Sequence, residues 1–266
     1  MFVLVDFLME YKKILKYFTD QAKEGVWNDL YNPSNPLSHS FIHRYRKATN
    51  LIKIKKNSKI LDMGCGTGVL IPFALQNKLK YSGIDNSKEM LDFCHNKFVN
   101  NLGKDQLNLF LSDFKEFKDL KNYDIFFGIG FIEYFQDPFE QINKIFSFLD
   151  ENKQLILSFP NKFSLDYFML NLFYIPRKII TFLFKESTRQ PPRSMFTIKQ
   201  IKFFAKNYKG IKIKYIHYNT NIFSYPFTRF FPKFTNYIGN LLEDSFLNKF
   251  SFFSSGFIVL FEKEKY

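Results

Sequence analysis

Three glycines that alternate over five residues, directly after an apolar run, are the first feature of this chain with a chemical implication. They are Gly64, Gly66 and Gly68, in the stretch ILDMGCGTGVL, and Asp62 precedes them. Glycine at this density lets the backbone approach a ligand closely. Because Asp62 would repel an anion and attract an amine, the loop favours a ligand that carries an amine.

The two common phosphate-binding loops fit these residues poorly. A dinucleotide fingerprint would need its third glycine at position 69, which is Val69. A Walker loop needs a Gly-Lys-Ser or Gly-Lys-Thr sequence, and this loop contains no lysine. The pattern is instead an acidic residue followed by three alternating glycines.

Two further acidic residues come at the ends of apolar runs. Asp85, in GIDNS, follows the glycine loop by about 20 residues, a spacing that lets a carboxylate bind both hydroxyls of a ribose. Asp85 could also stabilise the start of the helix that follows it, because an acidic residue is favourable there, and the two roles are compatible. Asp113, in LFLSDF, can accept a hydrogen bond from an exocyclic amine.

The glycine loop resembles the first motif of the class I S-adenosylmethionine-dependent methyltransferases, which reads acidic-x-Gly-x-Gly-x-Gly. The resemblance covers most of the chain and is strongest over residues 58–160. It implies that the loop backbone passes under the methionine and ribose of S-adenosylmethionine (SAM), with Asp62 near the methionine amine. The loop residues implied as cofactor contacts are Gly64, Cys65, Gly66 and Gly68.

The same resemblance implies cofactor contacts beyond the loop. Asp85 would bind the ribose, and Asp113 would bind the adenine amino group. The residues that would complete these contacts are Asn86, Ser112, Phe114, Gly128 and Ile129. Aromatic residues of the N-terminal helices would cover the cofactor, with ordinary core packing as the alternative, and the candidates are Tyr17, Trp27 and Tyr31.

Methyl transfer from a sulfonium depends mainly on alignment, because the leaving group is neutral and already activated. A base is needed only when the acceptor must lose a proton. The candidate bases are Glu133, Tyr134, His39 and His43. In many quinone-pathway relatives a histidine follows the glutamate, but here that residue is Tyr134. The two histidines lack a third ligand, so a metal site is disfavoured.

The elements that would position these residues alternate along the chain. Period-two and apolar runs predict strands at 59–61, 81–85, 107–111, 123–129, 154–159, 211–218 and 255–263. Helical spacing predicts helices over 5–24, about 37–52, 68–77, 87–100, 137–149 and 197–208. This rhythm predicts an α/β fold with a doubly wound, seven-stranded, mostly parallel sheet of the Rossmann-like methyltransferase type.

The domain organisation that we predict has two parts. Residues 1–52 form an N-terminal helical cap, and residues 53–266 form the methyltransferase domain. Aromatic-rich helical insertions interrupt this domain at about 161–196 and 219–250.

The positive charge of the chain is unevenly distributed. The net charge is +13, and residues 161–240 carry 14 Lys and Arg against 2 Asp and Glu, or +12. Such a segment suggests an anionic membrane, an anionic substrate or nucleic acid as a binding partner, with compositional drift as the alternative explanation of the charge.

No signal peptide is expected, and the longest apolar region, 165–184, is too polar to span a membrane. Because Cys65 and Cys94 form neither a disulfide framework nor a zinc pattern, a cytoplasmic location is expected.

Together these features predict a SAM-dependent methyltransferase that acts on a small, apolar acceptor. Oxygen is favoured as the acceptor atom by analogy with relatives in quinone and tetrapyrrole pathways. We predict a small-molecule or lipid-like acceptor, and peripheral contact with an anionic membrane through residues 161–240. The alternatives are a SAM-binding regulatory or scaffold protein without transfer activity, and an RNA methyltransferase. Nucleic acid is disfavoured because the Asn/Asp-Pro-Pro-aromatic motif is absent.

Overall fold

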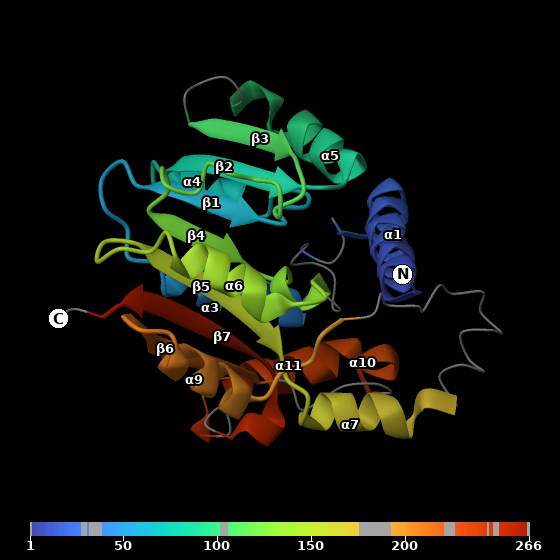
Figure 1. The fold of residues 1–266 in the computed structure, drawn as a ribbon. Coiled ribbons are helices and arrows are strands. Elements are labelled where there is room, and N and C mark those ends of the chain that lie inside the picture. Colours follow the sequence, from blue (N-terminus) through green and yellow to red (C-terminus); the bar gives the residue numbers. More distant parts are fainter. Residues whose placement is uncertain are drawn as a thin grey trace.

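The computed structural model describes residues 2–27, 31, 39–101, 106–175, 193–220, 227–243, 245–246 and 250–264. Within these residues, seven strands form one sheet in the order β3-β2-β1-β4-β5-β7-β6 (Figure 1). Strand β7 is antiparallel to both of its neighbours, and the other neighbouring pairs are parallel. The strands are β1 (Lys59–Met63), β2 (Lys80–Asp85), β3 (Leu107–Leu111), β4 (Ile125–Gly128), β5 (Gln154–Pro160), β6 (Ile211–Thr220) and β7 (Ser254–Lys263).

This topology confirms the predicted α/β fold with a doubly wound, mostly parallel sheet. Because β1 to β5 run parallel, their carboxyl ends meet at one edge of the sheet. Asp62 lies in β1, Asp85 is the last residue of β2, and Asp113 follows β3. The three acidic residues therefore lie along the same edge, where ligands bind in folds of this class.

Side-chain caps fix where the helices that flank the sheet begin. Ser87 accepts a hydrogen bond from the Met90 amide at the start of α5, and Asp137 caps α6 in the same way. Thr197 and Gln200 form a capping box at the start of α9. The helices are α1 (Phe2–Lys23), α3 (His39–Asn50), α4 (Ile71–Gln76), α5 (Lys88–Phe98), α6 (Pro138–Phe146), α7 (Leu165–Leu172), α9 (Ile198–Asn207), α10 (Phe227–Phe230) and α11 (Pro232–Glu243).

Helix α4 begins three residues later than the predicted start at Gly68. Gly68 has a φ of +76°, which lies outside the right-handed helical region. The Gly68 amide instead donates to the Cys65 carbonyl at 3.0 Å and closes a turn. The helix starts at Ile71, and Pro72 lies in its first turn, where a missing amide hydrogen is tolerated.

We expect Gly68→Ala to lower the free energy of unfolding by about 2–3 kcal/mol, through left-handed strain and overpacking. A Cβ atom on Gly68 would lie 2.5 Å from Cys94 Sγ and 2.7 Å from Ile71 Cδ1. Gly25 is the matched control, because its φ is +71° but no atom lies within 4 Å of the position that a Cβ atom would take there. Urea unfolding should therefore show only about 1 kcal/mol for Gly25→Ala. Equal losses in the two variants would contradict the packing explanation.

The core consists of two apolar clusters, one on each face of the sheet. One face packs against α6 and α9 through residues such as Leu61, Ile142 and Ile201. The other packs against α3, α4 and α5, with Ile60 and Ile71 among its residues. Neighbouring residues of β1 thus point to opposite layers, as the pleat of a strand requires. Burial on both faces holds the carboxyl edge of the sheet in a fixed position.

The two predicted insertions carry helices where the structure describes them. The first contains α7, and residues 176–192 of it lie outside the described part of the chain. The second contains α10 and α11, although β6 continues to Thr220 and therefore overlaps its predicted start. A search of the described residues finds no helix of the length and apolar character needed to cross a membrane.

The predicted division between a helical cap and a methyltransferase domain stays a prediction. Helix α1 contacts α5, because Thr19 Oγ1 donates to Glu89 Oε2 at 3.3 Å. Lys23 Nζ adds an ion pair with Glu89 at 3.7 Å. The N-terminal segment thus lies against the sheet domain and over the carboxyl edge (Figure 1).

Candidate functional site

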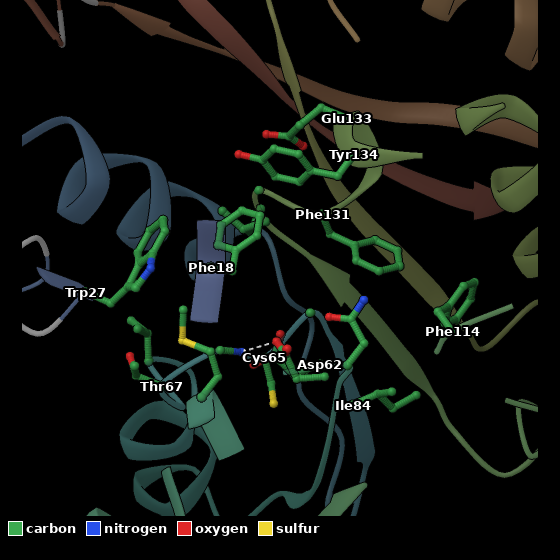
Figure 2. A pocket seen from close by; sticks show the side chains of 18 of the residues that line it. Phe18, Trp27, Asp62, Cys65, Thr67, Ile84, Phe114, Phe131, Glu133 and Tyr134 are labelled. Atoms are coloured by element: carbon green, nitrogen blue, oxygen red, sulfur yellow. Dashed lines mark hydrogen bonds between the residues drawn. The ribbon is translucent and has the colours of Figure 1, made fainter. Parts of the chain in front are cut away.

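A cavity of about 400 Å³ lies at the carboxyl edge of the sheet, between the glycine loop and the N-terminal helices. Asp62, Cys65, Thr67 and Ile84 form one wall in Figure 2, and Glu133 and Tyr134 lie across the cavity from them. The cavity therefore has an acidic, backbone-rich wall and an aromatic, polar wall.

The glycine loop makes its turn through backbone hydrogen bonds to β2. The amides of Gly64 and Cys65 donate to the Ile84 carbonyl at 2.9 and 3.0 Å. Gly64 and Gly66 have φ values of +69° and +51°, which glycine adopts without strain. A Cβ atom on Gly64 would lie 3.0 Å from the Phe131 ring. The loop thus presents bare backbone to the cavity.

Asp85 is held in place by two backbone donors. Its Oδ2 accepts from the Gly66 amide at 2.8 Å, and its Oδ1 accepts from the Ser87 amide at 2.9 Å. Burial raises the pKa of Asp85, and these hydrogen bonds oppose the rise. A carboxylate oxygen can accept more than one hydrogen bond, so Asp85 can still accept from two ligand hydroxyls.

Asp62 is a buried carboxyl group at the end of β1. Tyr81 donates its hydroxyl hydrogen to Asp62 Oδ2 at 2.8 Å. Burial raises the pKa of Asp62 to about 7, the Tyr81 hydrogen bond lowers it, and the nearby Asp85 raises it further. A cationic group in the cavity would stabilise the ionised carboxylate.

The end of the cavity near β3 is lined by Ser112, Asp113 and Phe114. The Lys115 amide donates to Asp113 Oδ1 at 2.8 Å and orients this carboxylate. The Phe114 ring meets the Phe131 ring edge-on, with centroids 5.3 Å apart. An acceptor beside aromatic rings has the chemistry to bind a flat amino-substituted heterocycle.

Glu133 and Tyr134 lie in the short 3-10 helix η3 (Ile132–Tyr134) that follows β4. Glu133 is only 2% exposed. Burial raises its pKa, and the guanidinium groups of Arg44 and Arg193 oppose the rise. The Tyr134 ring packs edge-on against Phe18, with centroids 5.0 Å apart. Burial raises the pKa of Tyr134 above the ordinary value, so its hydroxyl keeps its proton at neutral pH.

Four buried polar atoms of the cavity wall make no hydrogen bond within the part of the chain that the structure describes. Each such atom costs about 1–3 kcal/mol when it stays unpaired. A polar ligand would supply their partners, so the cavity fits a group as rich in polar atoms as SAM. The atoms are Trp27 Nε1, Arg44 Nε, Tyr45 Oη and Glu133 Oε2.

Most of the sequence-predicted site residues meet at this cavity. Those that line it are Tyr17, Trp27, Tyr31, Asp62, Gly64, Cys65, Gly66, Asp85, Asn86, Ser112, Asp113, Phe114, Ile129, Glu133 and Tyr134. Their individual roles stay predictions. The Cys65 thiol is buried, which raises its pKa and makes a reactive thiolate unfavourable.

Three predicted residues do not line the cavity, and the side chain of a fourth is not described. Gly68, Gly128 and His43 are not among the residues that line the cavity. A Cβ atom on Gly128 would lie 2.9 Å from Leu157 and 3.1 Å from Phe131, so this glycine makes room for the wall instead of forming it. The side chain of His39 lies outside the described part of the structure.

Sequence reasoning missed several residues of the wall. Phe18 stacks on Trp27 with centroids 5.7 Å apart, and its helical spacing alone gave no sign of this role. Arg44 and Arg193 come from α3 and from the residues before α9, and neither belongs to a motif. The Ser194 amide donates to the Glu133 carbonyl at 2.7 Å, which brings Arg193 to the cavity.

A protein family described as a methyltransferase domain matches residues 54–191, slightly more than half of the chain. The chain belongs to this methyltransferase family. The predicted family is thereby confirmed. This chain is 33% identical over 154 residues to the carboxy-S-adenosyl-L-methionine synthase of Campylobacter lari. The match covers 55% of this chain and 63% of that protein, so the chain spans less than two thirds of this curated relative.

Two solved structures share the fold of this chain. One is the plantazolicin methyltransferase BpumL in complex with a monoazolic desmethylPZN analog and S-adenosylhomocysteine (SAH). Its TM-score is 0.57 at 18% identity, over 97% of this chain and 96% of that chain. The other is the magnesium protoporphyrin IX methyltransferase ChlM from Synechocystis PCC 6803 with bound SAM. Its TM-score is 0.56 at 14% identity, over 96% and 97% of the two chains. Identities this low establish the shared fold alone.

Proposed function

We propose that this chain transfers a methyl group from SAM to a small, largely apolar acceptor, and that the receiving atom is oxygen. The observation that carries the proposal is the convergence of the glycine loop, Asp62 and Asp85 on one wall of a single cavity. Asp62 has the charge to bind the methionine amine, and Asp85 has the free acceptor positions to bind the ribose. When bound, SAM supplies an activated methyl group on a sulfonium.

The opposite wall supports the acceptor half of the proposal. Phe18, Trp27 and Tyr134 form an aromatic surface beside the buried Glu133 carboxyl. Such a surface desolvates an apolar acceptor and orients it, which is the main contribution that methyl transfer requires. Glu133 would accept the proton when the acceptor is a hydroxyl group, because burial raises its basicity.

Calorimetric titration with SAH tests the cofactor half of the proposal. We expect one binding site per chain, and an absence of binding would overturn the proposal. Overexpression followed by mass spectrometry of metabolites and lipids tests the acceptor half, and we expect a product that has gained one methyl group. SAH binding without any methylated product would instead favour a regulatory or scaffold protein. RNA methylation would overturn the small-molecule acceptor.

We expect the dissociation constant of SAM to rise about tenfold when the pH falls from 7 to 5.5. The pKa of Asp62 is about 7, so this carboxyl becomes protonated over that range and loses its attraction for the methionine amine. The α-amino group of the ligand stays protonated throughout this range, so its own titration contributes little. Calorimetry across the range measures the effect. In Asp62→Asn the affinity should be lower and almost independent of pH, and an unchanged pH dependence in that variant would refute the role of Asp62.

A second candidate function is the formation of carboxy-S-adenosyl-L-methionine, the product named for the Campylobacter lari relative. Arg44 and Arg193 both line the cavity, and a guanidinium group binds a carboxylate well. Mass spectrometry of the nucleoside that copurifies with the protein separates the two candidates. A carboxylated nucleoside would support this second function, whereas SAM or SAH would support methyl transfer.

A further inference from the structure

The turn that follows β3 forms the wall of the cavity at one end. We call residues 113–117 the β3 turn. Asp113 and Phe114 both line the cavity. The amides of Glu116 and Phe117 donate to the Asp113 carbonyl at 3.0 and 3.2 Å and close the turn. The shape of the β3 turn therefore sets where the Asp113 carboxylate and the Phe114 ring lie.

The ammonium group of Lys144, in the last turn of α6, holds the β3 turn from outside the cavity. Its Nζ donates to the carbonyls of Phe114 at 2.8 Å, Lys115 at 2.9 Å and Phe117 at 3.1 Å. An ammonium group has three hydrogens, so these bonds can use all of them. Lys144 is not among the residues that line the cavity, so it acts on the wall and not on the contents.

The same ammonium group also contacts the Phe114 ring and the Asp113 carboxylate. Lys144 Nζ lies 4.8 Å from the centroid of the Phe114 ring, within the range of a cation–π interaction. The ring is buried and meets the Phe131 ring, which lies beside it in Figure 2. Burial lowers the pKa of Lys144, and the charge of Asp113 opposes this change. Lys144 thus interacts with the backbone, the ring and the carboxylate of the β3 turn.

Lys153 offers a comparison within the same chain. Its Nζ donates to the carbonyl of Lys121 at 2.9 Å and forms an ion pair with Asp150 at 3.5 Å. None of these three residues lines the cavity. Lysine has more rotamer freedom to lose than most side chains, and charge-assisted hydrogen bonds offset that loss in both cases. The two lysines therefore differ mainly in what they hold, and Lys144 alone of the two holds the cavity wall.

We propose that Lys144 is a positioning residue for the adenine end of the SAM site, where it sets the orientation of Asp113 toward the adenine amino group. The link between the two residues is the backbone of Lys115. The Lys115 carbonyl accepts from Lys144, and the Lys115 amide donates to Asp113 Oδ1 at 2.8 Å. A shift of the β3 turn would therefore move the carboxylate as well. The place of adenine rests on the proposed function, whereas the contacts of Lys144 do not.

Calorimetry with two ligands, SAH and S-inosylhomocysteine, tests the proposal. In S-inosylhomocysteine an oxygen replaces the adenine amino group, so the hydrogen bond to Asp113 is lost. We expect the native chain to bind SAH at least tenfold more tightly, the ordinary effect of one hydrogen bond to a charged group. Lys144→Met keeps an apolar side chain of similar length but removes the ammonium group. In this variant the preference for SAH should fall to about threefold or less, through weaker binding of SAH.

Two further variants separate positioning from stability. Lys144→Arg should keep most of the preference for SAH, because a guanidinium group still donates to carbonyls. Lys153→Met is the matched control and should bind both ligands as the native chain does. The ratio of the two dissociation constants in one preparation does not depend on the folded fraction, so partial unfolding leaves the test valid. If Lys144→Met does not fold, Lys144→Gln takes its place with the same expected loss of preference.

The possible failures of this experiment have different meanings. A native preference for SAH that persists in Lys144→Met or Lys144→Gln would overturn the proposal, since the lysine would then only stabilise the fold. Equal binding of the two ligands by the native chain would also overturn it, because Asp113 would not contact the amino group. No binding of SAH by the native chain would instead overturn the proposed function.

Discussion

Replacing Glu133 with Gln is expected to lower the turnover number for a hydroxyl acceptor about a thousandfold, the middle of the range for the loss of a general base. The carboxyl is buried, its Oε2 has no hydrogen-bond partner within the described residues, and it lines the cavity beside Tyr134. Gln keeps the shape but cannot accept the acceptor's proton. Steady-state kinetics with the methylated acceptor, once it is identified, measures the effect.

The pH profile distinguishes a base from a residue that only fills space. Burial raises the pKa of Glu133, so the rate of the native enzyme should rise with pH through a value above that of an ordinary glutamate. Glu133→Gln should lose this acidic limb and keep its affinity for SAH. Glu140→Gln, on the exposed side of α6, is the control and should change neither quantity. A full rate in Glu133→Gln would show that the acceptor reacts without losing a proton, as a carboxylate does.

The cofactor half of the site was accessible from the sequence because each part of it is local. A strand, a turn and a helix place Asp62, Gly64 and Gly66 within a few residues of one another. Asp85 ends the neighbouring strand, so the parallel register alone brings it to the loop. Short-range patterns of this kind persist in the folded chain, and the structure places these residues at one cavity.

The acceptor half was largely inaccessible because it depends on contacts between distant segments. Arg193 reaches the cavity through the hydrogen bond from Ser194 to the Glu133 carbonyl, and no spacing in the sequence records this pairing. For Phe18, the sequence predicted only an apolar position of an amphipathic helix. Gly68 and Gly128 do not line the cavity, and close packing against Cys94 and Phe131 requires glycine at these positions as strictly as a ligand would. A glycine motif therefore predicts a tight backbone more reliably than it predicts a contact.

The two walls of the cavity also differ in how firmly they are held. The donor wall is built on buried strands and on hydrogen bonds from amides to Ile84 and Asp85. The acceptor wall combines η3, which follows β4, with segments that approach the sheet from outside, namely α1, α3 and the residues around Arg193. Such an arrangement keeps the cofactor site constant, while the acceptor site can vary in sequence and shape with the surrounding segments. Other folds that support many functions follow the same principle.

The strongest test of the donor wall is Asp85→Asn, for which we expect the affinity for SAH to fall about a thousandfold. Two hydrogen bonds from ribose hydroxyls to a charged acceptor contribute about 1.5–3 kcal/mol each, and each 1.4 kcal/mol is a factor of ten. Asn keeps one oxygen only, so one of the two backbone donors, from Gly66 or Ser87, would also lose its carboxylate partner. Calorimetry measures the affinity.

Stability and affinity should respond to this substitution in different ways, and that difference makes the test decisive. Burial raises the pKa of Asp85, so the ionised carboxylate costs folding free energy at neutral pH, and removing the charge offsets part of the lost hydrogen bonding. The melting temperature of Asp85→Asn without ligand should therefore be close to that of the native chain. The rise in melting temperature that SAH produces in the native chain should disappear in this variant. Asp92→Asn is the control, because Asp92 pairs with Lys88 on the exposed side of α5, and it should bind SAH normally. Native affinity in Asp85→Asn would show that this carboxylate only shapes the loop.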